Sequence, residues 1–139
     1  MENPMPRNLY VNLPVKDLER TVDFFAALGF SFNPMFTDEN ATCMIINDST
    51  SVMLLVESYF ATFTKKPIAD AHAATETLLA ISVDSRAEVD DFVARAIAKG
   101  AVEYAEPKDL GFMYQRGIAD LDGHQWEVFF MDESQFPGA

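Results

Sequence analysis

An internal repeat constrains this sequence more than any other feature. Residues 12–15 match residues 80–83, and residues 23–26 match residues 91–94 at the same distance from the preceding segment. The offset between the matched segments is 68 residues. A repeat of this kind indicates two copies of one supersecondary unit. The chain is therefore expected to contain two units with the same order of strands and helices.

The first copy has the pattern of a β-α-β-β-β unit. Apolar side chains occupy every second position of residues 8–15, which is typical of a strand. Asp17 suits a helix N-cap, and the apolar residues after it recur at helical spacing as far as Leu28. Turn-forming clusters then separate three short strands, which we predict at residues 30–36, 41–46 and 51–57.

The second copy repeats this order after a connection that contains Pro67. We predict a strand at residues 76–83 and a helix that begins at the capping box of Ser85 and Glu88 and ends at Gly100. Further strands are predicted at residues 101–105, 112–118 and 124–131. The predicted organisation is a single domain, residues 1–139, made of a module at 8–57, a linker at 58–75 and a module at 76–131.

Composition and charge exclude several classes of partner. The chain has 139 residues, of which 49% are hydrophobic, and its formal net charge is −12. Nucleic acids and anionic membranes select basic surfaces, so neither is expected as a partner. The single cysteine, Cys43, allows no disulfide framework, and neither a signal peptide nor an apolar run of membrane-spanning length is recognisable. A cytoplasmic protein is the simplest expectation, and the acidity would favour a cationic ligand.

The motifs at the two ends of the repeat resemble those of a known superfamily. They are Leu-Pro-Val-Lys-Asp-Leu-Glu-Arg-Thr-Val-Asp-Phe-Phe at residues 13–25, Leu-Gly-Phe at 28–30 and Asp-Leu-Asp-Gly-His-Gln-Trp-Glu at 120–127. Together with the repeat, they resemble the vicinal oxygen chelate superfamily over residues 9–131. Its members include glyoxalase I, extradiol dioxygenases, fosfomycin resistance enzymes and bleomycin resistance proteins.

The resemblance implies an α+β fold in which tandem β-α-β-β-β modules form a cupped mixed sheet with helices on its outer face. This is the glyoxalase/bleomycin resistance/dihydroxybiphenyl dioxygenase fold. It leaves the function open, because one scaffold can host isomerases, dioxygenases, transferases and binding proteins.

In the metal-dependent members, the cup holds a divalent ion through side chains on the first and last strands of each module. The matching positions in this sequence are Tyr10, a position within one residue of Leu54, Leu78 and Glu127. Only Glu127 is a customary metal ligand, and a catalytic ion needs three or four N/O ligands. We therefore expect no cofactor, with a divalent metal ion held by Glu127 as the alternative.

Glu127 needs an explanation, because it lies in the middle of an apolar strand. A carboxylate there is costly unless it is paired, hydrogen-bonded, metal-bound or exposed to a wet cavity. Strand alternation places Glu127 opposite Trp126, and thus in the cup if the helices cover the Trp126 face. We predict Glu127 as a catalytic or ligand-facing residue, or as a carboxylate hydrogen-bonded to Tyr10 or an arginine.

Other side chains are expected to line the cup. Tyr114 and Arg116 share a strand face, which is either the cup face, where Arg116 would neutralise Glu127 or grip an anion, or an ordinary surface. His124 is expected to cap a turn or to lie at the surface. The predicted ligand-binding residues are Tyr10, Asn12, Met53, Phe112, Tyr114, Arg116 and Phe129, unless these fill an interface with another subunit.

Three functions are open at this point. The first is a small-molecule-binding protein of the bleomycin-resistance type, a homodimer with a largely apolar cup and a degenerate metal site. The second is a metal-dependent enzyme that resembles glyoxalase I (lactoylglutathione lyase) or an extradiol dioxygenase. The third is a metal-free lyase or isomerase with Glu127 as base and Tyr10 or Arg116 as electrophile. The missing metal ligands favour the first.

Overall fold

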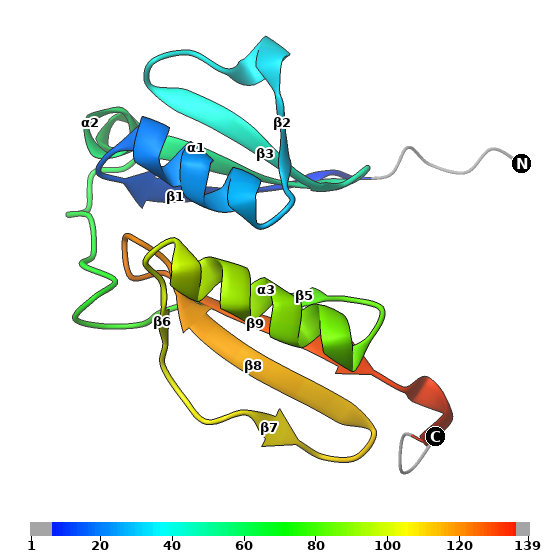
Figure 1. Cartoon of the computed structure of the whole chain (residues 1–139). Coiled ribbons are helices and arrows are strands. Elements are labelled where there is room, and N and C mark those ends of the chain that lie inside the picture. The colour runs from blue at the N-terminus through cyan, green and yellow to red at the C-terminus, as the bar shows by residue number, and fades with distance from the viewer. Residues whose placement is uncertain (1–6, 136–139) are drawn as a thin grey trace, which may run out of the picture. The chain divides into compact units, whose positions relative to one another are not determined.

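The computed structural model describes residues 7–135, which fold as two compact units (Figure 1). Unit 1 ends at Ile68 and unit 2 begins at Ala69. Each unit contains one mixed sheet and one helix of ten residues or more, which confirms the expected α+β class. Among the described residues, no helix is long and apolar enough to cross a membrane.

The sheet of unit 1 has the strand order β1-β4-β3-β2. Strand β1 runs parallel to β4, and the remaining neighbours are antiparallel. The parallel pair follows from the helix that carries the chain across the sheet between β1 and the other strands. The strands are β1 (Leu9–Val15), β2 (Ser31–Asn33), β3 (Ala41–Asn47) and β4 (Thr50–Val56).

Helix α1 (Leu18–Ala27) covers one face of this sheet. It begins where the Asp17 side chain accepts a hydrogen bond of 3.1 Å from a backbone N–H of the first turn. It ends before Gly29, whose φ of 99° suits a residue without a side chain. Phe24 and Phe25 are each 1% exposed, and burying each contributes roughly 1.5–3 kcal/mol.

Short helical turns border the open side of the unit 1 sheet. They are η1 (Pro34–Phe36), α2 (Glu57–Phe60) and η2 (Ala61–Phe63). The last two follow β4 directly and contain the aromatic residues Tyr59, Phe60 and Phe63.

The sheet of unit 2 has the order β5-β9-β8-β6, and β7 also pairs with β8. As in unit 1, the first strand runs parallel to the last, here β5 to β9. This shared topology is what the sequence repeat predicts. The strands are β5 (Leu78–Ser82), β6 (Val102–Glu103), β7 (Lys108–Asp109), β8 (Met113–Ala119) and β9 (Gln125–Met131), and a short turn, η3 (Glu133–Gln135), follows.

Helix α3 (Arg86–Ala98) lies across β8 and β9 (Figure 1). Its capping box is present: the Ser85 hydroxyl accepts a hydrogen bond of 3.1 Å from the N–H of Glu88, and the Glu88 carboxylate accepts one of 3.3 Å from the N–H of Asp84. The core of the unit consists of apolar side chains from α3 and from the sheet face beneath it, namely Val89, Phe92, Val93, Ala96, Ile118, Trp126 and Val128.

Several strand ends differ from the sequence prediction, and three of the differences have a local structural reason. The strand predicted at residues 30–36 stops at Asn33, because Pro34 cannot donate to the ladder and starts a 3₁₀ turn. The strand predicted at residues 51–57 stops one residue earlier, since Glu57 is the first residue of α2. The strand predicted at residues 101–105 ends at Glu103, and the Tyr104 ring that follows packs against Gly117.

Candidate functional site

The face of the unit 1 sheet that α1 leaves uncovered is here called the cup face of unit 1. Strand register places Asn12 beside Met53, and Met53 beside Cys43, on this face. The alternating residues Leu13 and Leu54 point toward α1 and are buried. The expected pocket residues Asn12 and Met53 are thus neighbours on one surface.

A cavity of about 270 Å³ opens on this cup face. Asn12 and Met53 form part of its floor, and the short helical turns form its walls. The rings of Tyr59 and Phe63 meet edge to face, with their centroids 5.1 Å apart. The cavity is lined by Asn12, Met35, Phe36, Thr37, Asp38, Ala41, Met53, Leu55, Tyr59 and Phe63.

One wall of this cavity is held by its own polar groups. The Asn33 side chain accepts a hydrogen bond of 3.0 Å from the N–H of Met35. The Thr37 hydroxyl donates to the Asn33 carbonyl at 2.8 Å and lies 2.9 Å from the Thr42 hydroxyl. The Asp38 carboxylate accepts two backbone N–H groups, at 2.8 and 3.0 Å. The wall is therefore formed before any ligand arrives.

The apolar residues of the walls are unusually exposed for their size. Met35 is 81% exposed, Phe63 67% and Phe36 51%. Exposed apolar side chains that gather at a cavity are typical of a surface that binds an apolar ligand. Contact with water does not stabilise such side chains, whereas contact with an apolar ligand does. The sequence analysis did not include these wall residues among the predicted ligand-binding residues. The available signal was the cluster of aromatic residues after β4.

The expected metal positions of unit 1 carry no customary metal ligand. Met53 pairs in register with Asn12 as Glu127 pairs with Ala80, so Met53 is the counterpart of Glu127. A thioether suits soft metals and not the hard divalent ions of N/O sites. Tyr10 is a phenol on the outer strand and is 49% exposed.

Unit 2 offers Leu78 and Glu127 at the matching positions. Leu78 has no donor atom, so one carboxylate remains. Among the described residues, no group of three or more His, Cys, Asp or Glu side chains is placed to hold a metal ion. The side chains at these positions do not fit a divalent ion that needs three or four N/O ligands.

Glu127 lies on the face of the unit 2 sheet opposite α3, here called the cup face of unit 2. Trp126, on the other face, is 1% exposed and packs under α3, as the alternation predicts. The Glu127 carboxylate accepts a hydrogen bond of 2.8 Å from the Gln115 side chain. Phe129 shares the face with Glu127 and Gln115, and it pairs in register with Gln115. The partner of the carboxylate is therefore a neutral amide from the neighbouring strand.

Tyr104 lies beside Glu127, and sequence reasoning missed it. Its ring sits against Gly117, where a Cβ atom would come within 2.5 Å of the ring. Its hydroxyl is buried and, within the described part of the chain, has no hydrogen-bond partner. Burial and the nearby charge of Glu127 raise the pKa of the Tyr104 hydroxyl, which keeps it protonated. The available signal was Gly117, because a glycine inside a strand often marks the close approach of another group.

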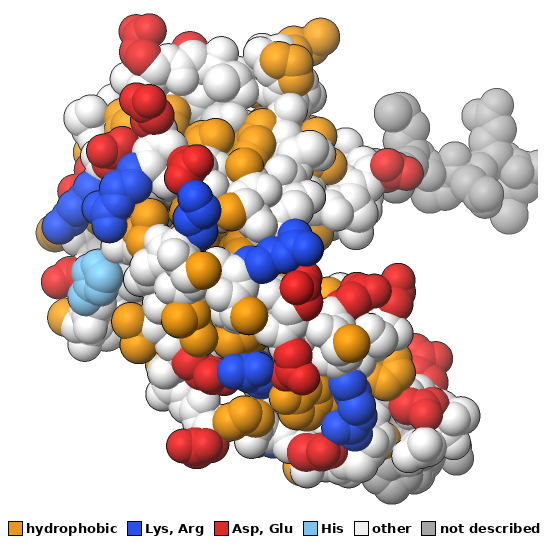
Figure 2. All heavy atoms as spheres, viewed as in Figure 1, with side chains coloured by type: hydrophobic (Ala, Val, Ile, Leu, Met, Phe, Trp, Pro, Cys, Tyr) orange, Lys and Arg blue, Asp and Glu red, His pale blue; other side chains and the backbone are white. Residues whose placement is uncertain are grey.

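Arg116 and Tyr114 lie on the α3 face of the sheet, so the structure does not bring them to Glu127. The Arg116 guanidinium donates to Glu103 at 2.7 and 2.8 Å and to Asp90 of α3 at 2.9 Å. The bonds between Arg116 and Glu103 raise the pKa of Arg116 and lower the pKa of Glu103, and hydrogen bonds from Tyr114 and Arg116 lower the pKa of Asp90. Figure 2 shows Lys and Arg interspersed with Asp and Glu over this face. Arg116 therefore does not neutralise Glu127, contrary to one of the two expectations from the sequence.

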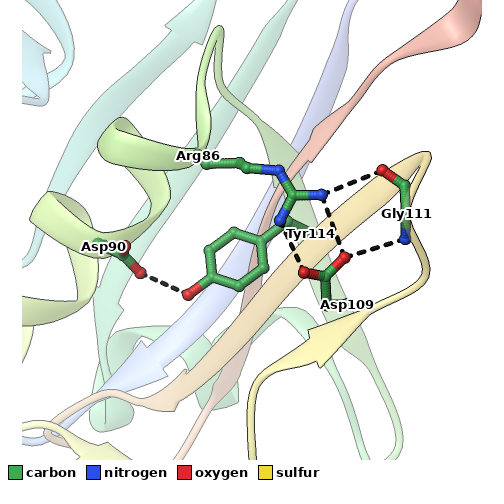
Figure 3. Close-up of polar contacts among 5 residues, drawn as sticks. All are labelled: Arg86, Asp90, Asp109, Gly111 and Tyr114. Atoms are coloured by element: carbon green, nitrogen blue, oxygen red, sulfur yellow. Dashed lines mark hydrogen bonds and ion pairs between the residues drawn. The ribbon is translucent and has the colours of Figure 1, made fainter.

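A second arginine joins α3 to the sheet edge (Figure 3). Arg86 donates to both carboxylate oxygens of Asp109, at 2.8 and 3.1 Å, and to the carbonyl of Gly111 at 3.0 Å. Its guanidinium carbon lies 5.1 Å from the centroid of the Tyr114 ring, and the Tyr114 hydroxyl donates to Asp90 at 2.6 Å. Hydrogen bonds from Arg86 and Gly111 lower the pKa of Asp109 to about 2.

The turn before β9 is organised by Asp120, which is 6% exposed. Its carboxylate accepts the Trp126 indole N–H at 2.9 Å and the backbone N–H groups of Asp122 and His124, each at 3.0 Å. The His124 ring lies 3.3 Å from the same carboxylate. Burial opposes protonation of His124, but the bond to Asp120 and the charges of Asp120 and Asp122 together outweigh burial and raise the pKa of the imidazole. His124 therefore supports the turn.

Phe112, the last of the predicted ligand-binding residues, directly precedes β8. Its carbonyl accepts a hydrogen bond of 2.7 Å from the N–H of Asp132. This bond closes the end of the β8–β9 pair, so the backbone of Phe112 has a structural role.

Comparison with known proteins agrees with this fold. The profile of the bleomycin resistance protein-like N-terminal family matches residues 7–47. No curated protein matches the chain at a significant level. A hypothetical protein, SA1046, from S. aureus is similar with a TM-score of 0.78 and 26% identity, over 91% of this chain and 95% of that one.

Two further solved structures have names that point to one superfamily. A glyoxalase-related enzyme from Fulvimarina pelagi has a TM-score of 0.76 at 20% identity, over 91% of this chain and 88% of that one. A glyoxalase/bleomycin resistance protein/dioxygenase family enzyme from Burkholderia phytofirmans PsJN has a TM-score of 0.73 at 19% identity, over 88% and 96%. These similarities show that the chain has the fold that the resemblance implies.

Proposed function

The chain has the fold of the vicinal oxygen chelate superfamily, and from this premise we propose that it is a small-molecule-binding protein with a degenerate metal site. The observation that carries the proposal is the cavity on the cup face of unit 1, where Met53 occupies the counterpart position of Glu127. A methionine at the centre of an aromatic wall offers a polarisable apolar contact. An apolar organic ligand fits this surface better than a metal ion does.

The polar groups of the cavity are few, which is the usual composition of a small-molecule site. Asn12 lies on its floor, where its side-chain N–H₂ makes only a long hydrogen bond of 3.4 Å to the Tyr10 carbonyl. Its amide oxygen and remaining N–H can orient a ligand. Tyr59 and Phe63, joined edge to face, offer an aromatic surface to a flat molecule.

The test uses the neutral fluorophore N-phenyl-1-naphthylamine as the probe. Wild-type protein should give a saturable increase in fluorescence. Met53→Arg, which introduces a long charged side chain into the floor, should weaken the apparent Kd at least tenfold, about 1.4 kcal/mol. Phe63→Ala should weaken it less, because this exposed ring forms only one wall.

The matched control is Ile97→Arg, which makes a similar change of charge and size on the exposed side of α3. Ile97 is 46% exposed, lies in unit 2 and does not line the unit 1 cavity. Ile97→Arg should keep the wild-type Kd. The absence of saturable binding to wild-type protein, or a wild-type Kd in Met53→Arg, contradicts the proposal.

A further inference from the structure

The Glu127 carboxylate has acceptor capacity that the protein leaves unused. Its only hydrogen bond within the described part of the chain comes from the neutral amide of Gln115, to Oε2. Among the described residues, no Lys, Arg or His side chain forms an ion pair with it. A half-buried carboxylate without a positive neighbour loses hydration that nothing replaces. A cation that enters the cup face of unit 2 would supply the missing charge.

Tyr104 adds a second acceptor and an aromatic surface at the same point. Its ring lies against Gly117, which is the register partner of Glu127 on β8. The hydroxyl is buried and makes no well-formed hydrogen bond among the described residues, and burial, the Glu127 charge and the approach of the Glu127 carboxylate raise its pKa. Leaving a buried hydroxyl unsatisfied is unfavourable, so a ligand group that bonds to it is favoured.

Two arginine clamps fix the segment that carries Tyr104. On one side, Arg116 holds Glu103 through a pair of hydrogen bonds of 2.7 and 2.8 Å. On the other, Arg86 holds Asp109 through a pair of 2.8 and 3.1 Å (Figure 3). Paired bonds from a planar guanidinium define orientation as well as distance. Tyr104 is therefore positioned before a ligand binds, which reduces the entropy lost on binding.

A cavity of about 350 Å³ adjoins this pair within unit 2. Tyr104 and Ala119 line it from the sheet, and residues 71–75 form its other side. Gln125 also lines it and accepts a hydrogen bond of 2.5 Å from the Thr75 hydroxyl. Glu127 lies two residues further along the same face, roughly 7 Å from Gln125. The lining residues include His72 but no Lys or Arg.

We propose that Glu127 and Tyr104 form a recognition site for a positively charged nitrogen on a small aromatic ligand. The ring of the ligand occupies the cavity beside Tyr104, and its charged nitrogen donates to the free oxygen of Glu127 and to the Tyr104 hydroxyl oxygen. An amidinium, a guanidinium or a protonated amine meets these requirements. The site lies in unit 2 and does not depend on the unit 1 cavity that carries the proposed function.

The test compares two probes that differ in charge and hardly in shape, benzamidine and benzamide. Each is titrated into the full-length ¹⁵N-labelled chain at pH 7.5, and amide chemical shifts give the Kd. Benzamidine should bind at least about tenfold more tightly than benzamide, because only the amidinium pairs with a carboxylate. Glu127→Gln, which keeps the shape of the side chain, should reduce this preference to less than about twofold. Tyr104→Phe, which keeps the ring, should reduce it about threefold.

Two control variants show whether the preference for benzamidine arises at Glu127. Glu76→Gln removes one exposed carboxylate of unit 2 and should leave the preference for benzamidine unchanged. Met53→Arg should also leave the preference for benzamidine unchanged, even though it should weaken binding of the fluorescent probe in unit 1. Equal affinities of wild-type protein for the two probes would overturn the proposal. A preference that survives Glu127→Gln, or that falls equally in Glu76→Gln, would overturn it too.

Discussion

Unit 1 and unit 2 share a strand order but place different chemistry at the same point of the sheet. In unit 1 that point is Met53, flanked in register by Asn12 and Cys43. In unit 2 it is Glu127, flanked by Ala80 and Gly117. Small neighbours in unit 2 leave room for the Tyr104 ring, whereas unit 1 fills the corresponding space with its own side chains. The repeated fold thus carries an apolar side chain at this point in one copy and a carboxylate in the other.

The two units also differ in how their edges are held. Unit 1 uses local caps, such as the Asp38 carboxylate on two backbone N–H groups of its own turn. Unit 2 uses side-chain pairs far apart in the sequence, such as Arg86 with Asp109. Exposed ion pairs contribute little to stability, so their value here is in orientation more than in free energy. A charged site needs such orientation, while an apolar cavity depends mainly on shape.

The largest expected effect comes from the two aspartates that organise turns in the two units. Asp120→Ala should lower the free energy of unfolding by about 2–4 kcal/mol, because it leaves the buried Trp126 indole N–H and two backbone N–H groups without an acceptor. Asp38→Ala should cost only about 1 kcal/mol, since water replaces its acceptor at an exposed turn. Urea unfolding of both variants measures the difference. An equal loss of unfolding free energy in the two variants would contradict the expected difference between the turns of the two units.

A smaller effect is expected where the Tyr104 ring meets the sheet. Gly117→Ala should cost about 1–3 kcal/mol, because the added Cβ would lie 2.5 Å from the ring. In a Tyr104→Ala background the same change should cost less than about 0.5 kcal/mol, since the obstructing ring is gone. The double-mutant cycle is measured by urea unfolding. At the counterpart position in unit 1, Cys43→Ala should show no coupling to Tyr104→Ala, and a strong coupling there would disprove the assignment.

The smallest effect is a pH dependence confined to unit 2. The pKa of His124 is higher in the folded state than in the unfolded state. Its contribution to the free energy of unfolding is therefore fully present below the pKa of the unfolded state and is lost as the pH rises through the pKa of the folded state. When the pH is lowered from 8 to 6, the free energy of unfolding of the wild-type protein should rise by on the order of 0.5–1 kcal/mol relative to that of His124→Gln. Thermal or urea unfolding at the two pH values tests this. If the difference in unfolding free energy between wild-type protein and His124→Gln is the same at both pH values, the role of His124 is refuted.

The sequence predicts the repeat, the helices and most strands, because these depend on periodic burial and local caps. It also predicts the face of Glu127, since Trp126 must be buried under a helix. Arg116 was left open between two faces, although Ile118, two residues along the strand and 0% exposed, shares its side. Because Ile118 must be buried under the helix, Arg116 must lie on the same face of the sheet.

Tyr104 could not be predicted in the same way. Its role depends on a break in the edge strand after Glu103, and on a contact with Gly117 from another strand. A strand predicted over residues 101–105 gives no reason for the chain to leave the ladder there. Long-range pairs such as Arg86 with Asp109 fix the break, and sequence spacing alone does not reveal them.

The central proposal is that this chain binds small molecules on a cup face and holds no divalent metal ion at the positions where the vicinal oxygen chelate superfamily places one. The most direct measurement is elemental analysis of purified protein after exposure to Ni²⁺, Zn²⁺, Mn²⁺ or Fe²⁺ and removal of the free ion. The structure predicts far less than one ion per chain, with the same residual content in wild-type protein and Glu127→Ala. About one ion per chain in wild-type protein, lost in Glu127→Ala, would contradict the claim.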